Sequence, residues 1–240
     1  MRLRTGQLIR NSAKRYFTAR FPSSDWLDDD PKLHWPVHPA PQGLNPSECA
    51  LLVLGCQVGD FDDRVDAGHT LAKIRTSVET VRRFSSQIIF APLALDSLER
   101  QFIPSTNKEF FAFNSRNPFQ QCTTAADIHP GVGYGPDDLV MRRIRLGALS
   151  TTGLDMHLTN CGVTTLFIAG VDTSGAILST VREAADCDYR LILLSDCISD
   201  RDEVAHRLLF DRIFPRQAEI TTVDILARKL RETAPEVDAT

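Results

Sequence analysis

Four short apolar runs constrain the fold of this chain more than any other feature of its sequence. Runs of this length, without alternation of polar and apolar residues, are typical of strands buried on both faces, as in a parallel sheet. Between the first two, over residues 64–83, apolar residues recur at intervals of four and three, which predicts a helix with one buried stripe. The four runs are Ala50–Leu54, Ile88–Ala91, Thr164–Ala169 and Arg190–Leu194.

Two weaker strand patterns, at 138–141 and 219–222, raise the expected number of strands to six. Parallel strands need crossover connections, which helices supply in right-handed units. Helical patterns at 151–161, 175–186 and 223–232 lie between or after these strands. The sequence therefore predicts the α/β class, as a three-layer α/β/α sandwich around a six-stranded, mainly parallel sheet.

Two boundaries in the second half of the chain have local signals. The fourth apolar run is expected to end at Ser195-Asp196. Ser199 with Asp202 has the spacing of an acidic capping box and predicts a helix from there to about residue 213. Residues 96–136 are expected to be irregular, with short helical stretches.

The chain divides into three parts by composition. Residues 1–48 form a basic, proline-rich arm, and their first 24 residues carry six Lys and Arg and no acid. We expect a short amphipathic helix there, with Leu8, Ile9 and Phe17 on its apolar side; an organelle-targeting role for this basic start stays open. Residues 49–232 form the folded domain, and 233–240 a tail.

Composition excludes several classes of protein. The 240 residues have a formal net charge of −4 and no apolar run near the roughly 18 residues of a membrane span, so we expect neither nucleic-acid nor membrane partners. Six cysteines form no CxxC motif and no zinc-like cluster with histidine, which favours reduced thiols and a cytoplasmic location. The glycines of 131–135 do not have dinucleotide-loop spacing, so no cofactor is expected.

An acidic cluster follows the first strand but lacks the geometry of a calcium loop. We expect a solvated acidic loop and no metal site there. Its members are Asp60, Asp62, Asp63 and Asp66.

Ligand sites in such sheets lie at the carboxyl ends of strands, near the point where the strand order reverses. Three segments are expected to meet there: residues 54–61, the stretch after the 138–141 strand, and the turn at 170–176.

These three segments resemble the isochorismatase-like family, also called the cysteine hydrolase superfamily. Residues 50–61, A-L-L-V-L-G-C-Q-V-G-D-F, resemble the family's A-L-L-V-I-D-M-Q-N-D-F, with Gln57, Asp60 and Phe61 in common. Residues 135–143 resemble the approach to the family's lysine, and 170–180, G-V-D-T-S-G-A-I-L-S-T, resemble its G-V-x-T-x-x-C-V-x-x-T element. Ser195-Asp196 and His206 also fall where the family often has them, and the resemblance covers about residues 49–230.

The resemblance implies a catalytic Asp, Lys and Cys in which the thiolate attacks an amide or related carbon. At the corresponding positions this chain has Gly55, Arg143 and Ala176. True isochorismatases lack the cysteine but keep the acid, which Gly55 cannot supply. The resemblance therefore implies a hydrolase fold in which neither family chemistry can run, and restoring all three residues is expected to return weak activity at best.

Other residues could substitute for the altered ones. Asp172, in the turn before Ala176, could be a relocated carboxylate or a helix cap. The guanidinium of Arg143 would suit a carboxylate or phosphate. Cys56 should point to the opposite side of the strand, and Asp60 is expected to make structural hydrogen bonds.

Three alternatives for function stay open. The chain binds a small carboxylate- or amide-containing molecule, or it is an interaction subunit, as a homo-oligomer or with an active relative, or it is a hydrolase or lyase that uses Asp172 and Arg143. The resemblance implies self-association, since family members are commonly dimers or tetramers. It also implies a cis peptide bond between Gly175 and Ala176. The expected pocket residues are Gly55, Phe61, Arg143, Asp172, Gly175 and Ala176.

Overall fold

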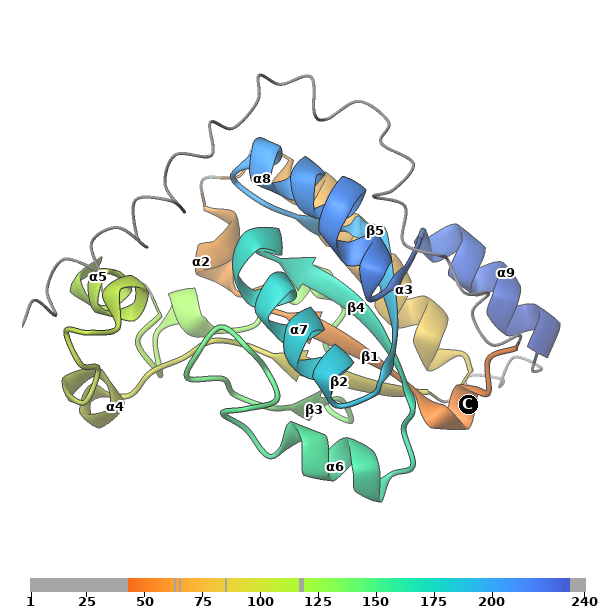
Figure 1. The fold of residues 1–240 in the computed structure, drawn as a ribbon, viewed down its shortest axis with the longest axis horizontal. Helices are drawn as coiled ribbons and strands as arrows, with labels where there is room; N and C mark the ends of the chain where they lie inside the picture. The colour runs from red at the N-terminus through yellow and green to blue at the C-terminus, as the bar shows by residue number, and fades with distance from the viewer. Residues whose placement is uncertain (1–42, 63, 65, 85, 117–118, 234–240) are drawn as a thin grey trace, which may run out of the picture. The chain divides into compact units, whose positions relative to one another are not determined.

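The structure, a computed structural model, describes residues 43–233 except 63, 65, 85 and 117–118. It contains one six-stranded sheet in which every pairing is parallel, in the order β3-β2-β1-β4-β5-β6 (Figure 1). This confirms the predicted fold class. The amphipathic helix expected near Leu8 and the tail from residue 234 lie outside the described residues.

β1 lies near the centre of the sheet, and later strands are added first on one side of it and then on the other. The chain moves from β1 outward through β2 to β3, and then returns to the other side of β1 to form β4, β5 and β6. The ends of β1 and β4 therefore flank the point at which a parallel sheet most often holds a ligand. The strands are β1 Cys49–Leu54, β2 Gln87–Ala91, β3 Leu139–Val140, β4 Thr165–Val171, β5 Arg190–Ser199 and β6 Glu219–Thr221.

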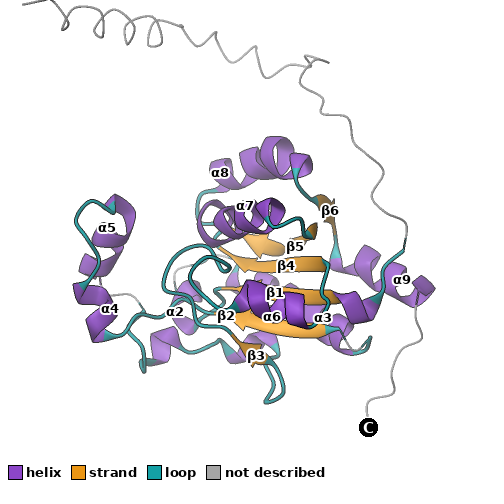
Figure 2. Ribbon diagram, turned by 60° about the horizontal axis from the view of Figure 1, so that its bottom comes forward, coloured by secondary structure: helices purple, strands orange, loops and turns teal. Residues whose placement is uncertain are grey.

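Helices cover both faces of the sheet, as Figure 2 shows. α3 and α9 pack against each other and against β5 on one face, while α6 and α7 lie over the other. The helices are α2 Val58–Phe61, α3 Ala67–Arg82, α4 Ser97–Gln101, α5 Lys108–Arg116, α6 Leu154–Asn160, α7 Leu178–Asp186, α8 Glu203–Leu208 and α9 Val223–Thr233.

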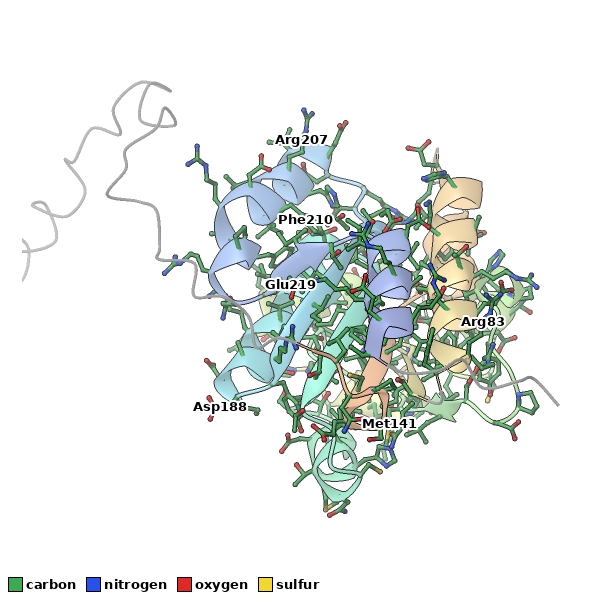
Figure 3. All side chains as sticks on the ribbon, turned by 90° about the vertical axis from the view of Figure 1, so that its right-hand side faces the viewer. Arg83, Met141, Asp188, Arg207, Phe210 and Glu219 are labelled. Carbon is green, nitrogen blue, oxygen red and sulfur yellow. The ribbon has the colours of Figure 1, made fainter. Side chains whose placement is uncertain are left out.

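Alternation along β1 explains the two cores. Leu51 and Val53 pack with α3 and α9, whereas Leu52 and Leu54 pack with α6 and α7. Every residue of β1 is buried, as expected for a strand covered on both faces. Side chains fill the space between the sheet and its helices, as the side view in Figure 3 shows.

Gly170 allows β1 and β4 to approach closely at their carboxyl ends. It pairs with Leu54 and has φ +130°, and a Cβ atom there would lie 2.1 Å from the carbonyl oxygen of Leu54. Only glycine fits this position without moving the backbone. The two strand ends that carry the candidate site are thereby held side by side.

Two sequence-based boundaries are wrong. β5 does not end at Ser195-Asp196 but continues to Ser199 through an irregularity, because its pairing with β4 resumes at Gly170 and Ile198. Ser199 is therefore a strand residue and no cap. Asp202 alone caps α8, accepting hydrogen bonds from the backbone amides of Val204 and Ala205.

Within the described residues, no helix is long and apolar enough to cross a membrane.

Candidate functional site

The carbonyl oxygen of Ala91, at the end of β2, joins two of the three segments predicted to meet. It accepts a hydrogen bond from the backbone amide of Gly55 at 3.2 Å and another from Nε of Arg143 at 2.7 Å. Gly55 in turn lies against Val171, which is the last residue of β4 and belongs to the third segment. Positions 55 and 143 therefore share one region, at the switch point of the sheet.

Gly55 has a backbone conformation that disfavours any side chain. Its φ is +67°, and the following Cys56 also has a positive φ, +64°. A Cβ atom on Gly55 would lie 3.0 Å from the carbonyl oxygen of Val171 and 3.1 Å from Oδ2 of Asp60. The carboxyl group of Asp60 thus lies beside the position from which the family's acid would extend.

Asp60 lies beside Gly55, in surroundings that the sequence did not reveal. It is buried, so the expectation of a solvated acidic loop is wrong for this residue. Its Oδ2 accepts a hydrogen bond from the backbone amide of Gln57 at 2.9 Å, which confirms the expected structural bond. Burial, with a contribution from the charge of Asp172, raises the pKa of Asp60 to about 6. A carboxyl group with this pKa can hold or release a proton near neutral pH.

The side chain of Gln57 holds the surrounding loops in place. Its Nε2 donates hydrogen bonds to the carbonyl oxygens of Leu93 and Ala126, and its Oε1 accepts one from the amide of Leu93, each at 2.8 Å. The side chain is fully buried. The motif glutamine therefore acts as a structural connector between β1, β2 and the 126 loop.

Arg143 is buried, and its hydrogen bonds to the main chain give it a structural role. Beside the bond to Ala91, its Nη1 donates to the carbonyl oxygens of Arg145 and Leu146. Burial lowers its pKa to about 10, so the guanidinium remains charged at neutral pH. Its positive charge lies near Asp60 and Asp172.

Asp172 forms an ion pair with Arg64, a residue that carried no sequence signal. The side chain of Arg64 is largely buried and also donates hydrogen bonds to the carbonyl oxygen of Asp60 and to Oγ of Ser199. Among the described residues, the ion-pair partner of Asp172 is Arg64, and no ion pair between Asp172 and Arg143 is found. Only the long-range arrangement of the fold could have placed Arg64 here.

The turn that carries Ala176 is a π-helical turn, η6 Thr173–Ile177, continuous with α7. Every peptide bond in the described part of the chain is trans, so the expected cis bond between Gly175 and Ala176 is wrong. The amides of Gly175 and Ile177 donate to the carbonyl oxygen of Asp172, in a continuous helical turn. The methyl group of Ala176 is buried in the core beneath α7.

Two polar pairs flank this turn. Oδ2 of Asp200 accepts hydrogen bonds from the backbone amide and the hydroxyl of Ser174, at 2.6 and 2.8 Å. Oγ1 of Thr173 lies 2.7 Å from Nδ1 of His206, whose pKa is lowered by burial. Thr173 is fully buried, so its hydroxyl group is no accessible nucleophile.

Two further residues singled out in the sequence, Cys56 and Phe61, are buried. The thiol of Cys56 is fully buried and donates to the carbonyl oxygen of Leu54; burial and the charge of Asp60 raise its pKa well above the usual value. Phe61 packs edge-on against His129 in the core. In the described part of the chain, no group of three or more His, Cys, Asp or Glu residues could hold a metal ion.

The site therefore contains the buried carboxyl group of Asp60, whose pKa is raised, and two guanidinium groups. The thiol of Cys56 and the hydroxyl of Thr173 are buried, whereas the hydroxyl of Ser174 is exposed and donates a hydrogen bond to Asp200. It can hold charge and exchange a proton through Asp60.

The fold and the location of the candidate site place the chain in a class: α/β/α proteins with a candidate site at the switch point of the sheet, beside the central strand. Residues 49–225 match the model of the Isochorismatase domain. Because this match covers most of the chain, the protein belongs to the isochorismatase family.

Known relatives and solved structures agree with this assignment. The chain is 24% identical over 176 residues to "Uncharacterized isochorismatase family protein YwoC" of Bacillus subtilis, covering 73% of this chain and 90% of that protein. An isochorismatase family protein from Burkholderia thailandensis superposes with a TM-score of 0.65 at 24% identity, covering 79% of this chain and 98% of the other. A cysteine hydrolase from Pseudomonas syringae pv. phaseolicola superposes with a TM-score of 0.69 at 17% identity, covering 83% and 96%. These structural likenesses concern the fold alone.

Proposed function

We propose that this chain acts by binding and performs no thiol amidohydrolysis. The observation that carries the proposal is the buried methyl group of Ala176, at the position where the family motif has its nucleophile. Gly55 supports it, because its positive φ and its contacts leave little room for the family's acid.

Binding of a partner chain is favoured over binding of a small carboxylate- or amide-containing molecule. The groups that would recognise an anion already have partners within the chain: Arg143 binds main-chain carbonyls, Arg64 binds Asp172, and the amide of Ser174 binds Asp200. A small anion would have to displace these contacts, at a cost in desolvation and lost hydrogen bonds. The partner is a second copy of this chain or an active relative.

The first prediction concerns activity. The purified protein is expected to hydrolyse nicotinamide, N-carbamoylsarcosine and isochorismate no faster than buffer, since removal of a nucleophile alone costs several orders of magnitude. Ammonia release and product absorbance measure this directly. Turnover that persists through purification and disappears in Asp60→Asn or Asp172→Asn would contradict the proposal.

A second candidate function is favoured by one observation, the raised pKa of Asp60 beside the charge of Arg143. A hydrolase or lyase that needs only proton transfer could use this carboxyl group. In that case Asp60 replaces Asp172 as the acid or base, because Asp172 is engaged by Arg64.

A further inference from the structure

A thiol and an imidazole face each other at the end of α6. Sγ of Cys161 lies 3.8 Å from Nε2 of His157, one helical turn earlier. The backbone amide of Cys161 also donates a hydrogen bond to the carbonyl oxygen of His157, at 3.1 Å, so the two side chains share one side of the helix. α6 leads into the amino end of β4 (Figure 1), whereas the candidate site lies at the carboxyl ends of the strands. The pair is therefore separate from that site.

The ring of His157 has a second partner on the sheet. Oε1 of Gln87, the first residue of β2, lies 3.0 Å from the same Nε2 atom. A carbonyl oxygen only accepts hydrogen bonds, so this contact is best satisfied when Nε2 carries a proton. His157 can therefore take the proton of the Cys161 thiol at Nε2, and Gln87 then accepts a hydrogen bond from the imidazolium group.

The thiol of this pair is open to solvent. Cys161 is exposed. A Cβ atom on the next residue, Gly162, would have no neighbour within 4 Å apart from the adjoining residues, so there is room beside the sulfur for an incoming molecule. An exposed thiol next to a base has the two properties that a nucleophilic cysteine needs.

The other cysteines lack this combination. Cys49, Cys56 and Cys197 are buried, and burial raises the pKa of each of these thiols. Cys187 is exposed, but desolvation and the negative charge of nearby carboxylates raise its pKa. Cys122 is exposed as well, and no hydrogen bond to its thiol is found within the described part of the chain. Cys161 should therefore react first.

We propose that Cys161 is a modification site at which the thiol exchanges with a low-molecular-weight disulfide, with His157 as the base. As the sulfur of Cys161 attacks one sulfur atom of the disulfide, its proton passes to Nε2 of His157. The disulfide bond breaks, and the second sulfur leaves with the bonding electron pair as a thiolate, which then takes up the proton. The products are a mixed disulfide on Cys161 and one free small thiol. This inference does not depend on the proposed function.

Incubation of the full chain with oxidised glutathione at pH 7.5, followed by mass spectrometry of its peptides, tests the proposal. We expect the mixed disulfide to form at least about tenfold faster on Cys161 than on Cys122 or Cys187, because a positioned base speeds a proton transfer by about 10²–10⁴-fold in enzyme sites and by less at an open surface. His157→Gln should remove this advantage and leave the rates at Cys122 and Cys187 unchanged. The matched control is His69→Gln, on the exposed side of α3, which should alter none of the three rates.

The comparison of the three exposed cysteines within the wild-type chain requires no variant. Equal rates at these cysteines overturn the inference. So does a fast reaction at Cys161 that His157→Gln leaves unchanged, or that His69→Gln slows to the same extent. A fall at all three cysteines in His157→Gln would show a general change of structure, which circular dichroism detects, and it also contradicts a role of His157 as the base.

Discussion

Simultaneous replacement of Gly55 by Asp, Arg143 by Lys and Ala176 by Cys is expected to destabilise the protein strongly without restoring a hydrolase. The aspartate would be forced into a positive φ, within 3.0 Å of a main-chain oxygen. Its carboxyl group would also lie close to the buried carboxyl group of Asp60. A new buried charge without a partner costs about 3 kcal/mol or more.

The lysine adds a second cost. Arg143 reaches the carbonyls of Ala91, Arg145 and Leu146 with its guanidinium group. A single ammonium group cannot reproduce this forked geometry, and each buried acceptor left unpaired costs about 1–3 kcal/mol. Together the two changes remove at least about 5 kcal/mol, which is comparable with the whole stability of a typical domain.

Urea denaturation of the three single variants and the triple variant measures these effects. Ala176→Cys is the comparison, since it adds one sulfur atom but no charge to the core and is expected to cost about 1–3 kcal/mol, less than Gly55→Asp. A triple variant as stable as the wild type, with efficient amide hydrolysis, would show that the family site is intact in this chain.

The strands were predictable because their sequence signal is local. β1 and β4 are buried on both faces, so their apolar runs stand out from the surrounding sequence. The end of β5 was not predictable, because a polar Ser195-Asp196 pair normally ends a strand, and only pairing with β4 beyond Gly170 extends it. The end of β5 is therefore set by its pairing with β4, against the local sequence signal at Ser195-Asp196.

The site shows the same limit. Positions 55 and 143 were singled out from sequence motifs, and in the structure both residues donate a hydrogen bond to the same carbonyl oxygen, that of Ala91. Arg64 could not be found in this way, because its role depends on contacts with residues more than 100 positions away. Asp60 was visible as a motif residue, but its burial beside Gly55 required the backbone geometry of both positions.

Conversion of Asp60 to Asn is expected to stabilise the protein near neutral pH. The pKa of Asp60 is about 6 in the folded chain against 3.8 for an ordinary aspartate. Its contribution to stability is therefore complete below about pH 4 and is lost as the pH rises through 6, by up to ~3 kcal/mol. Asparagine resembles the protonated carboxyl group and still accepts the hydrogen bond from the amide of Gln57. The variant should therefore keep its stability as the pH rises.

Urea unfolding of both proteins from pH 4 to pH 8 tests the expectation: the curves should separate above pH 5, with the variant the more stable. Asp138→Asn is the control, since that side chain is also largely buried but is paired with Arg82 at 2.7 Å, and loss of its charge should lower stability at pH 7.5. Parallel curves for the wild type and Asp60→Asn would contradict the expectation. A carboxyl group kept at a cost in stability is typical of functional sites, so a confirmed difference would favour the proton-transfer alternative over a purely structural role for Asp60.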